Sequence, residues 1–209
     1  MTQVFEVIRL AVRGFMRQVA RKLNKATNGQ LHPDVVTIAG LVMHIPIAVL
    51  IAMGSYNILA ALLLIVFGLF DTLDGELARL QKRSSPRGML LDASTDRMKE
   101  VLLYTGAAYV FAAGNNPTNA AWAVAACGAS LCVSYVKAKG EAAVASTKNE
   151  LTHHELNRLF KDGLLTFELR MTVLVVGLLV GHLTIAVAFI AILAAYTAIW
   201  RLVTISKAL

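Results

Sequence analysis

The sequence has few cysteines and few charged side chains for a chain of 209 residues. Its two cysteines, Cys127 and Cys132, lie in an apolar run with no histidine nearby, which excludes a disulfide scaffold and a cysteine-based zinc site. Only 16% of the residues are charged, against about 25% in an average soluble domain. With 57% hydrophobic residues and a mean hydropathy of +0.63, the composition excludes an ordinary soluble domain.

Charge is absent altogether from three stretches, residues 35–70, 101–136 and 171–200. Each stretch is longer than the roughly 20 helical residues that cross a bilayer core, and each has glycine- or asparagine-rich turn residues near its middle. Because backbone polar groups in lipid must be hydrogen-bonded internally, each stretch predicts a hairpin of two helices. The sequence therefore predicts an all-α polytopic membrane protein with six transmembrane helices.

These six helices are expected near residues 35–53, 57–81, 89–113, 118–139, 163–180 and 183–203. The charged residues then fall on one side of the membrane, with the longest polar connection at 140–162. Because Lys and Arg mark the cytoplasmic side, we expect a multi-pass protein of the cell membrane with both termini and the active site cytoplasmic. The net charge of +7 follows from this topology, and no nucleic-acid partner is expected.

The first 28 residues form a separate element. Arg9, Arg13, Arg17 and Arg21 recur every four residues and so lie on one face of a helix. Apolar residues lie largely away from this stripe, which predicts an interfacial amphipathic helix on anionic membrane lipid. A solvated helix end is the alternative interpretation. Residues 29–209 then form the six-helix transmembrane domain.

Acidic residues cluster where the second and third predicted membrane helices face each other. Asp71 and Asp74 lie on one face of the second helix, and Asp92 and Asp96 are one turn apart on the third. A carboxylate at the centre of a membrane helix costs roughly 2.5–3.5 kcal/mol, so this group needs a compensating partner. Divalent cations would neutralise it, and oxygen ligands favour Mg²⁺ or Mn²⁺ over zinc.

The residues after Asp74 add a place for a phosphate. Gly75 and Ala78 leave room for a close approach, and the Arg79 guanidinium can form paired hydrogen bonds to a phosphate. Two metal ions beside such an arginine form a phosphoryl-transfer site. Two alternatives remain: an interhelical salt-bridge network with Arg79 and Arg97, and a divalent-cation transporter. A transport path needs polar groups through the whole membrane, whereas the outer helix halves carry no charge.

The acidic segments carry a family resemblance. The pattern Asp71-x2-Asp74-Gly75-x2-Ala78-Arg79-x8-Gly88-x3-Asp92-x3-Asp96 resembles, at every position, the signature of the CDP-alcohol phosphotransferase family. The resemblance implies an enzyme that transfers a phosphatidyl or similar group from CDP-diacylglycerol, or an ether-lipid equivalent, to an alcohol and releases CMP. It also implies a homodimer.

By this resemblance, Asp71, Asp74, Asp92 and Asp96 would hold two Mg²⁺ ions, and Asp96 would also act as general base. The CDP-lipid would be bound by residues of the second helix, of the loop that follows it, and of the segment that opens the first membrane helix. These residues are Asp34, Val35, Val36, Thr37, Asp71, Gly75, Ala78, Arg79 and Ser85.

The acceptor is indicated by a second resemblance. Residues 134–141, Ser-Tyr-Val-Lys-Ala-Lys-Gly-Glu, resemble a segment of the phosphatidylinositol phosphate synthases. This similarity implies a phosphorylated polyol, inositol 1-phosphate, whose phosphate would contact Lys137, Lys139, Arg170 and Arg201. Phe167 stands where that subfamily usually has an arginine, so glycerol 3-phosphate, the acceptor of a phosphatidylglycerophosphate synthase, remains the alternative. A third interpretation of the four cations is that they anchor the protein at the cytoplasmic surface.

Overall fold

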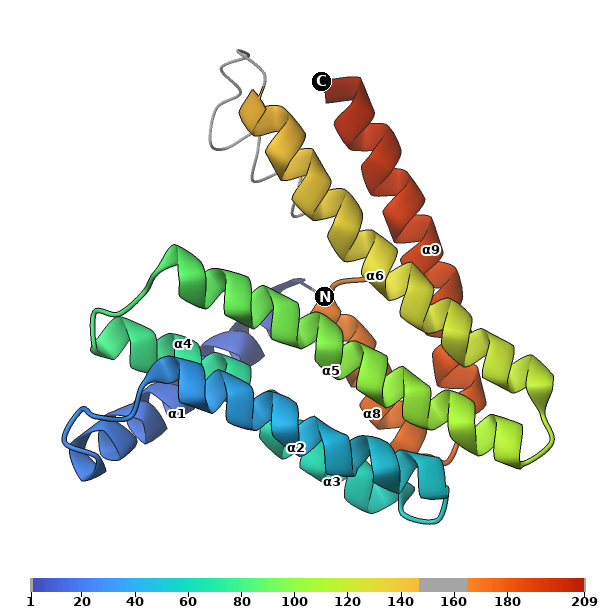
Figure 1. Ribbon diagram of the computed structural model, residues 1–209, viewed down its shortest axis with the longest axis horizontal. Helices are drawn as coiled ribbons and strands as arrows, with labels where there is room; N and C mark the ends of the chain where they lie inside the picture. Colours follow the sequence, from blue (N-terminus) through green and yellow to red (C-terminus); the bar gives the residue numbers. More distant parts are fainter. Residues whose placement is uncertain (1, 147–164, 209) are drawn as a thin grey trace. The chain divides into compact units, whose positions relative to one another are not determined.

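The computed structural model describes residues 2–146 and 165–208, and in these residues the regular structure is helical (Figure 1). The helices are α1 Thr2–Ala26, α2 Pro33–Met53, α3 Asn57–Gly68, α4 Phe70–Leu80, α5 Pro86–Ala113, α6 Pro117–Ser146, α8 Phe167–Leu179 and α9 Leu183–Ala208. The chain divides into two compact units, residues 1–47 with 62–102 and residues 48–61 with 103–209. The first unit holds α1, α4 and the start of α5, and the second holds α6, α8 and α9.

The three chain reversals predicted inside the charge-free stretches are confirmed. Gly54, Asn115 and Gly181 have φ values of 72°, 55° and 72° and lie in the α2–α3, α5–α6 and α8–α9 turns. This left-handed conformation is disfavoured for residues with a Cβ, although asparagine tolerates it better than most, which is why glycine and asparagine end helices in this way. The sequence therefore located the turns from the residues that permit them.

The bounds of several helices differ from the prediction. The second expected helix, 57–81, is interrupted at Leu69, where the amide nitrogen donates to the carbonyl of Val66, 3.3 Å away and three residues earlier. Gly68, just before the break, makes the backbone easier to bend. The helix expected to end at residue 139 continues to Ser146, so the polar connection predicted at 140–162 is helical at its start, and its residues 147–162 lie outside the described residues.

Within residues 2–146 and 165–208, four helical segments are long and apolar enough to cross a membrane. They are Pro33–Met53, Asn57–Leu80, Pro117–Val144 and Leu183–Lys207. The structure thus shows an all-α, multi-pass membrane protein. Two of the six predicted spans do not meet this criterion. They are α5, which carries charged residues of the motif, and α8, which has 13 residues. These two spans remain predictions.

In the first unit, α1 packs against α4 through a small apolar core. Met16 and Ala20 of α1 lie one helical turn apart, as do Leu73 and Leu77 of α4, and all four are buried in one cluster with Val36 of α2. Polar contacts extend this packing, because the Gln81 side-chain amide donates to the Asn24 side chain at 2.8 Å. This core fixes how α1 lies along the helix that carries the first two motif aspartates.

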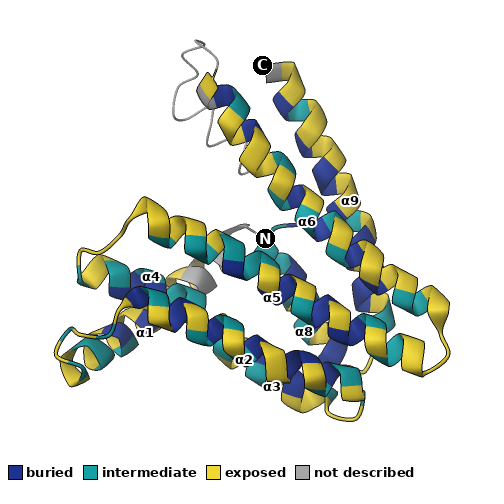
Figure 2. Ribbon diagram, in the orientation of Figure 1, coloured by how far each residue is buried: buried dark blue, intermediate teal, exposed yellow. Residues whose placement is uncertain are grey.

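In the second unit, α6 and α9 form an extended helix pair. Figure 2 shows buried residues along both helices, and many of them are small. Small residues let membrane helices approach closely without a hydrophobic driving force from water. The same reasoning applies to Gly177 of α8, where a Cβ would overlap the Ala186 side chain of α9.

Candidate functional site

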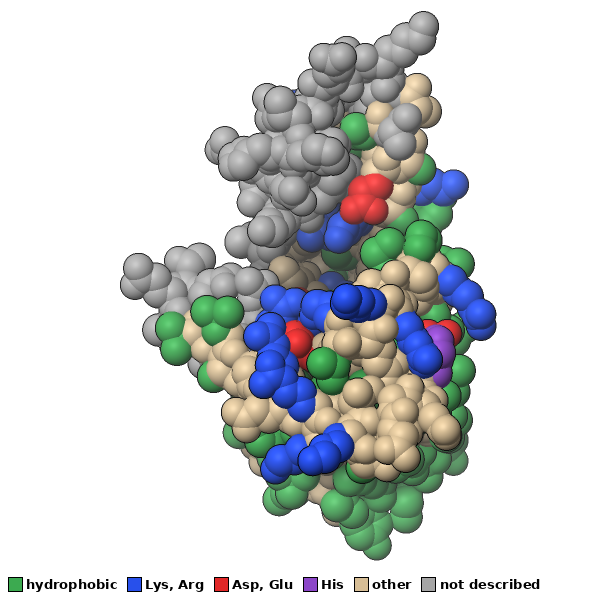
Figure 3. Space-filling model, turned by 90° about the vertical axis from the view of Figure 1, so that its left-hand side faces the viewer, with side chains coloured by type: hydrophobic (Ala, Val, Ile, Leu, Met, Phe, Trp, Pro, Cys, Tyr) green, Lys and Arg blue, Asp and Glu red, His purple; other side chains and the backbone are tan. Residues whose placement is uncertain are grey.

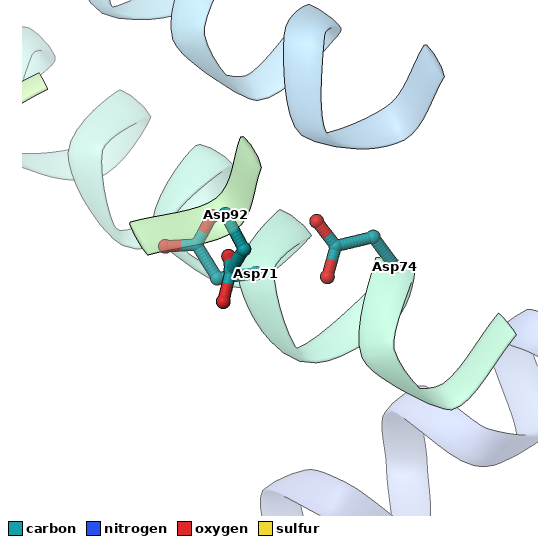
Figure 4. Close-up of side chains that lie close together, drawn as sticks. All are labelled: Asp71, Asp74 and Asp92. Carbon is teal, nitrogen blue, oxygen red and sulfur yellow. The ribbon is translucent and has the colours of Figure 1, made fainter. Parts of the chain in front are cut away.

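Three of the four predicted metal ligands lie together between α4 and α5 (Figure 4). Asp71 and Asp74 come from the first and second turns of α4, and Asp92 comes from α5. One carboxylate oxygen of each lies within 4.8 Å of the others. The three-residue spacing places the first two on one helix face, and the short connection after α4 allows α5 to return beside it.

The chemistry of this group fits a divalent cation. Its ligand atoms are all carboxylate oxygens, which suit Mg²⁺ and Mn²⁺. Asp92 Oδ1 is buried and has no hydrogen-bond partner among the described residues. A buried, unpartnered carboxylate oxygen carries an energetic penalty that a bound cation would remove. Asp74 is held in place by Thr37, whose hydroxyl donates to Oδ2 at 2.5 Å.

The fourth predicted ligand, Asp96, interacts with Asp71 and also with two basic residues. Its Oδ1 accepts a hydrogen bond from the Lys99 ammonium at 3.3 Å, and its Oδ2 is 3.7 Å from the Arg97 guanidinium. Lys99 also donates to Asp71 Oδ1 on α4. The side chain of Lys99 is only 1% exposed, so this ammonium is a buried counter-ion between the two aspartates.

Lys99 is a functional candidate that sequence reasoning missed. The available signal was its spacing: it follows Asp96 by three positions and Asp92 by seven, which places it on the acidic face of α5. From the sequence, Arg79 and Arg97 were the only basic partners expected for the acids. Of these, Arg97 lies near Asp96 but also reaches Glu100 at 2.9 Å, and Arg79 contacts Glu76.

Arg79 and Gly75 lie beside each other on α4. A Cβ on Gly75 would be 3.5 Å from a guanidinium nitrogen of Arg79, which is an ordinary van der Waals distance. The Arg79 side chain is 48% exposed, and one of its nitrogens lies 2.6 Å from Glu76 Oε1. Ala78, on the same helix, is half-buried. The guanidinium therefore keeps donors free for a ligand while one edge is fixed.

The segment that opens α2 is partly structural. Val36 is buried in the core between α1 and α4, and Thr37 binds Asp74, whereas Val35 is 52% exposed. Asp34 lies 3.5 Å from the His32 ring and 4.0 Å from Arg87. Thus Thr37 belongs to the carboxylate group directly, which sequence reasoning did not foresee.

Ser85 has a clear local role. Its hydroxyl accepts a hydrogen bond from the backbone amide of Gly88 at 3.1 Å, and Pro86 follows it at the first position of α5. This is the arrangement of a helix N-cap, which satisfies an amide that the helix leaves unpaired. The cap fixes the start of the helix that carries Asp92 and Asp96.

The predicted acceptor residues lie in the second unit. Arg170 and Arg201 have side chains buried from solvent, at 1% and 7% residue exposure, and they are close enough to interact electrostatically. Arg170 donates to the Leu165 carbonyl at 3.0 Å. The Arg201 Nε is buried without a hydrogen-bond partner among the described residues. Two buried like charges beside each other attract an anion, and the Glu141 carboxylate also interacts with Arg201.

The two lysines of this set are more exposed. Lys137 lies 3.8 Å from Glu141 on the same helix, and the Lys139 ammonium lies 5.9 Å above the Tyr135 ring. Contacts of this kind between exposed groups are weak. Of the four predicted cations, the structure therefore singles out Arg170 and Arg201 by burial.

Comparisons with known proteins show the family of this chain. The CDP-alcohol phosphatidyltransferase family matches residues 30–200. The bifunctional IPC transferase and DIPP synthase of Rubrobacter xylanophilus is 34% identical over 151 residues, which are 72% of this chain and 32% of that protein. The phosphatidylinositol phosphate synthase of Cutibacterium acnes is 33% identical over 119 residues, 56% of each chain. This chain therefore spans about a third and about half of the lengths of these two relatives.

A solved structure shares the fold. The phosphatidylinositol phosphate synthase of Mycobacterium tuberculosis, in complex with manganese and citrate, superposes with a TM-score of 0.78 at 25% identity, covering 92% of this chain and 89% of that one. The range matched by the family, residues 30–200, contains the motif segment from Asp71 to Asp96. The chain belongs to the CDP-alcohol phosphatidyltransferase family.

Proposed function

We propose that this protein is a Mg²⁺-dependent transferase that moves a phosphatidyl group from CDP-diacylglycerol, or an ether-lipid equivalent, to inositol 1-phosphate and releases CMP. The observation that carries the proposal is the meeting of Asp71, Asp74 and Asp92 within 4.8 Å in a chain that matches the family over residues 30–200. A phosphoryl-transfer site needs such a group because the donor diphosphate must be neutralised before it is attacked.

Asp71, Asp74 and Asp92, together with Asp96, would hold two Mg²⁺ ions, which Mn²⁺ could replace. Bound divalent cations would neutralise the donor diphosphate and the phosphate of the departing CMP. The Mycobacterium tuberculosis relative was solved in complex with manganese, which supports the binding of a divalent ion by this chain. The buried Asp92 Oδ1 without a hydrogen-bond partner in the described part of the chain supports it independently.

The donor would be bound by the start of α2 and by α4. Arg79 presents partly exposed donors to the diphosphate, and Gly75 and Ala78 leave room beside it. Residues Asp34 to Thr37 and Ser85 would lie against the nucleotide, as the family resemblance implies. Of these, Asp34 and Ser85 have polar side chains at accessible positions, whereas Val36 would act through packing.

The chemical step assigned to the chain is one proton transfer. Asp96 would accept the proton of the acceptor hydroxyl while that oxygen forms a bond to the β-phosphorus of the donor. The bond between the β-phosphorus and the bridging oxygen breaks, and CMP leaves with that oxygen. The Lys99 and Arg97 contacts of Asp96, at 3.3 and 3.7 Å, would orient its carboxylate for this step.

The acceptor is proposed from the second unit. Arg170 and Arg201, with Lys137 and Lys139, would bind a phosphate that a free polyol lacks, and the burial of the two arginines is the supporting observation. The names of the Cutibacterium and Mycobacterium relatives favour inositol 1-phosphate. Glycerol 3-phosphate is the second candidate, because Phe167 replaces the arginine usual at that position of the subfamily.

We also propose the cellular setting. The basic residues at the ends of the apolar helices favour a cell-membrane protein with the termini and the carboxylate site on the cytoplasmic side. Membrane lipids then contact the apolar helix surfaces, where many large side chains are exposed. A homodimer follows from the family resemblance.

The test is CMP release by the purified chain from CDP-diacylglycerol, with Mg²⁺ or EDTA and with a panel of acceptors. Inositol 1-phosphate should be used best, ahead of glycerol 3-phosphate and free inositol, and EDTA should stop the reaction. Equal use of inositol and inositol 1-phosphate would contradict the acceptor, and preference for glycerol 3-phosphate would replace it. Mg²⁺ uptake into liposomes, with no CMP release from CDP-diacylglycerol in the presence of any acceptor, would favour the transporter and contradict the enzyme.

A further inference from the structure

Glu76 is a buried carboxylate of α4 that the family pattern leaves variable. Its side chain is 3% exposed, yet three guanidinium groups reach it. Arg79 lies 2.6 Å from Oε1, Arg17 donates to Oε2 at 3.1 Å, and Arg13 lies 3.9 Å from Oε1. Arg13 and Arg17 come from α1, and Arg17 is 59 positions before Glu76 in the sequence.

The position of Arg17 is set by packing. Met16, its neighbour, and Ala20 are buried against Leu73 and Leu77 of α4. Glu76 lies between Leu73 and Leu77 in the sequence of α4. Because Met16 packs in the same cluster as these leucines, its neighbour Arg17 lies close enough to bind Glu76. Figure 3 shows several Lys and Arg side chains on the face that it draws. Packing of α1 against α4 brings Arg17 to a buried acid. Arg21, one turn further along the same stripe, is exposed and has no ion pair within the part of the chain that the structure describes.

The carboxylate binds its two main partners through different oxygens. Oε1 receives Arg79 and Oε2 receives Arg17, so Glu76 bridges the guanidinium of α1 and the guanidinium of the motif. One negative charge among three positive charges leaves the cluster cationic. The Arg17 and Arg79 side chains are 60% and 48% exposed, which keeps their remaining donors accessible to an anion. A long side chain that is already ordered loses less entropy when it binds.

We propose that α1 takes part in donor recognition: Arg17, through Glu76, holds the Arg79 guanidinium in the orientation that meets the donor diphosphate. Arg17 is thus a positioning residue, and Glu76 is the link. This inference rests on the proposed function, because it assigns Arg79 to the diphosphate of a CDP-linked lipid. It gives the N-terminal helix a role beyond attachment to the membrane surface.

The experiment compares Arg17→Ala with Arg21→Ala in the purified full chain, in neutral detergent with saturating Mg²⁺, and varies each substrate while the other is saturating. We expect Arg17→Ala to raise the KM for CDP-diacylglycerol about two- to tenfold, the size of the cost of ordering one long side chain, with kcat and the acceptor KM unchanged. Arg21→Ala should leave all three constants unchanged. Arg17→Lys, which keeps the charge, should restore part of the loss.

A double-mutant cycle separates positioning from general stabilisation. Once Glu76→Gln has removed the link, adding Arg17→Ala should raise the donor KM no further. Independent, additive effects of the two changes would overturn the proposal, as would identical kinetics for Arg17→Ala and Arg21→Ala. The melting temperature of Glu76→Gln shows whether this variant folds. If it does not, the donor KM values of Arg17→Gln and Arg17→Lys are compared instead, because the Arg17 side chain is exposed.

Failure of the proposed function gives a different result. The unaltered protein would then release no CMP from CDP-diacylglycerol with any acceptor, and the role of Arg17 would fall with it. An active protein whose Arg17 and Arg21 variants behave alike would overturn this inference alone. A loss of binding to anionic vesicles that is equal for both variants, with unchanged donor KM in detergent, would assign Arg17 to the membrane surface instead.

Discussion

The Lys99 ammonium donates a hydrogen bond to the Asp71 carboxylate, from α5 to α4, across 28 positions of sequence. The lysine is 1% exposed and the aspartate 21%. Removal of one member of a buried ion pair usually leaves the other charge uncompensated. Lys99 therefore supplies positive charge that the carboxylate group needs whenever no metal is bound.

This relationship predicts a metal-dependent effect of Lys99→Met on stability. In EDTA the variant should be less stable by about 3–5 kcal/mol, the usual cost of breaking a buried pair. With Mg²⁺ the loss should be smaller, because a divalent cation can neutralise the same carboxylates. Melting temperatures in detergent with and without Mg²⁺ measure this, with Lys22→Met, an exposed lysine of α1, as control. An equal loss under both conditions would contradict the role of Lys99.

The metal ligands can be tested apart from activity. Asp71→Asn, Asp74→Asn and Asp92→Asn should each weaken Mn²⁺ binding and remove most CMP release, because each contributes an oxygen to the group. Mn²⁺ binding is read by electron paramagnetic resonance. Glu168→Gln, at an exposed carboxylate in the first turn of α8, is the matched control. Asp96→Asn should also remove most activity, and normal turnover by two or more of the four variants would defeat the assignment.

The acceptor prediction concerns Arg170 and Arg201. Hydrogen bonds to a charged group are worth roughly 1.5–3 kcal/mol, so Arg170→Ala or Arg201→Ala should weaken use of a phosphorylated acceptor about ten- to a hundredfold. The loss should be in the acceptor KM, with the donor KM nearly unchanged. Because both arginines are buried, Lys137→Ala, an exposed member of the set, provides a variant with little effect on folding. A change confined to the donor KM would be incompatible with this role.

Close helix packing makes a stability prediction. A Cβ at Gly106 of α5 would overlap the carbonyl oxygen of Ala48 of α2, whereas a Cβ at Gly128 of α6 would meet no atom within 4 Å. Gly106→Ala should therefore destabilise the protein by about 1–3 kcal/mol, and Gly128→Ala should be neutral or stabilising by up to ~1 kcal/mol. Thermal unfolding in detergent measures both. Equal melting temperatures for the two variants would exclude this contact.

The orientation in the membrane is tested by cysteine labelling after Cys127 and Cys132 have been replaced. A cysteine at Asn116, in the α5–α6 turn, should react with an impermeant reagent from outside the cell. A cysteine at Ser84, in the α4–α5 connection, should react only after the membrane is made permeable. Labelling of position 84 from outside would place the carboxylate group on the other side.

Much of the candidate site could be predicted because its pattern is local. Asp71 and Asp74 lie on one face of α4 whatever that helix contacts, since a helix has 3.6 residues per turn. The turn at Gly181 could likewise be located from one residue. The interruption of the helix at Leu69 was not predicted. It depends on a single hydrogen bond to Val66, which does not change the hydropathy of the segment.

The sequence by itself determined the charge-free helices, the three turns and the spacing of the motif, because each depends on residues near one another in the chain. Tertiary structure alone decided which side chains meet: Lys99 with Asp71, Thr37 with Asp74, and Arg17 with Glu76. The physical reason is that contacts between helices depend on how the helices are rotated and offset against each other. That register is set by packed side chains, such as the buried Met16 and Leu77 of the α1–α4 core, and no spacing within one helix encodes it.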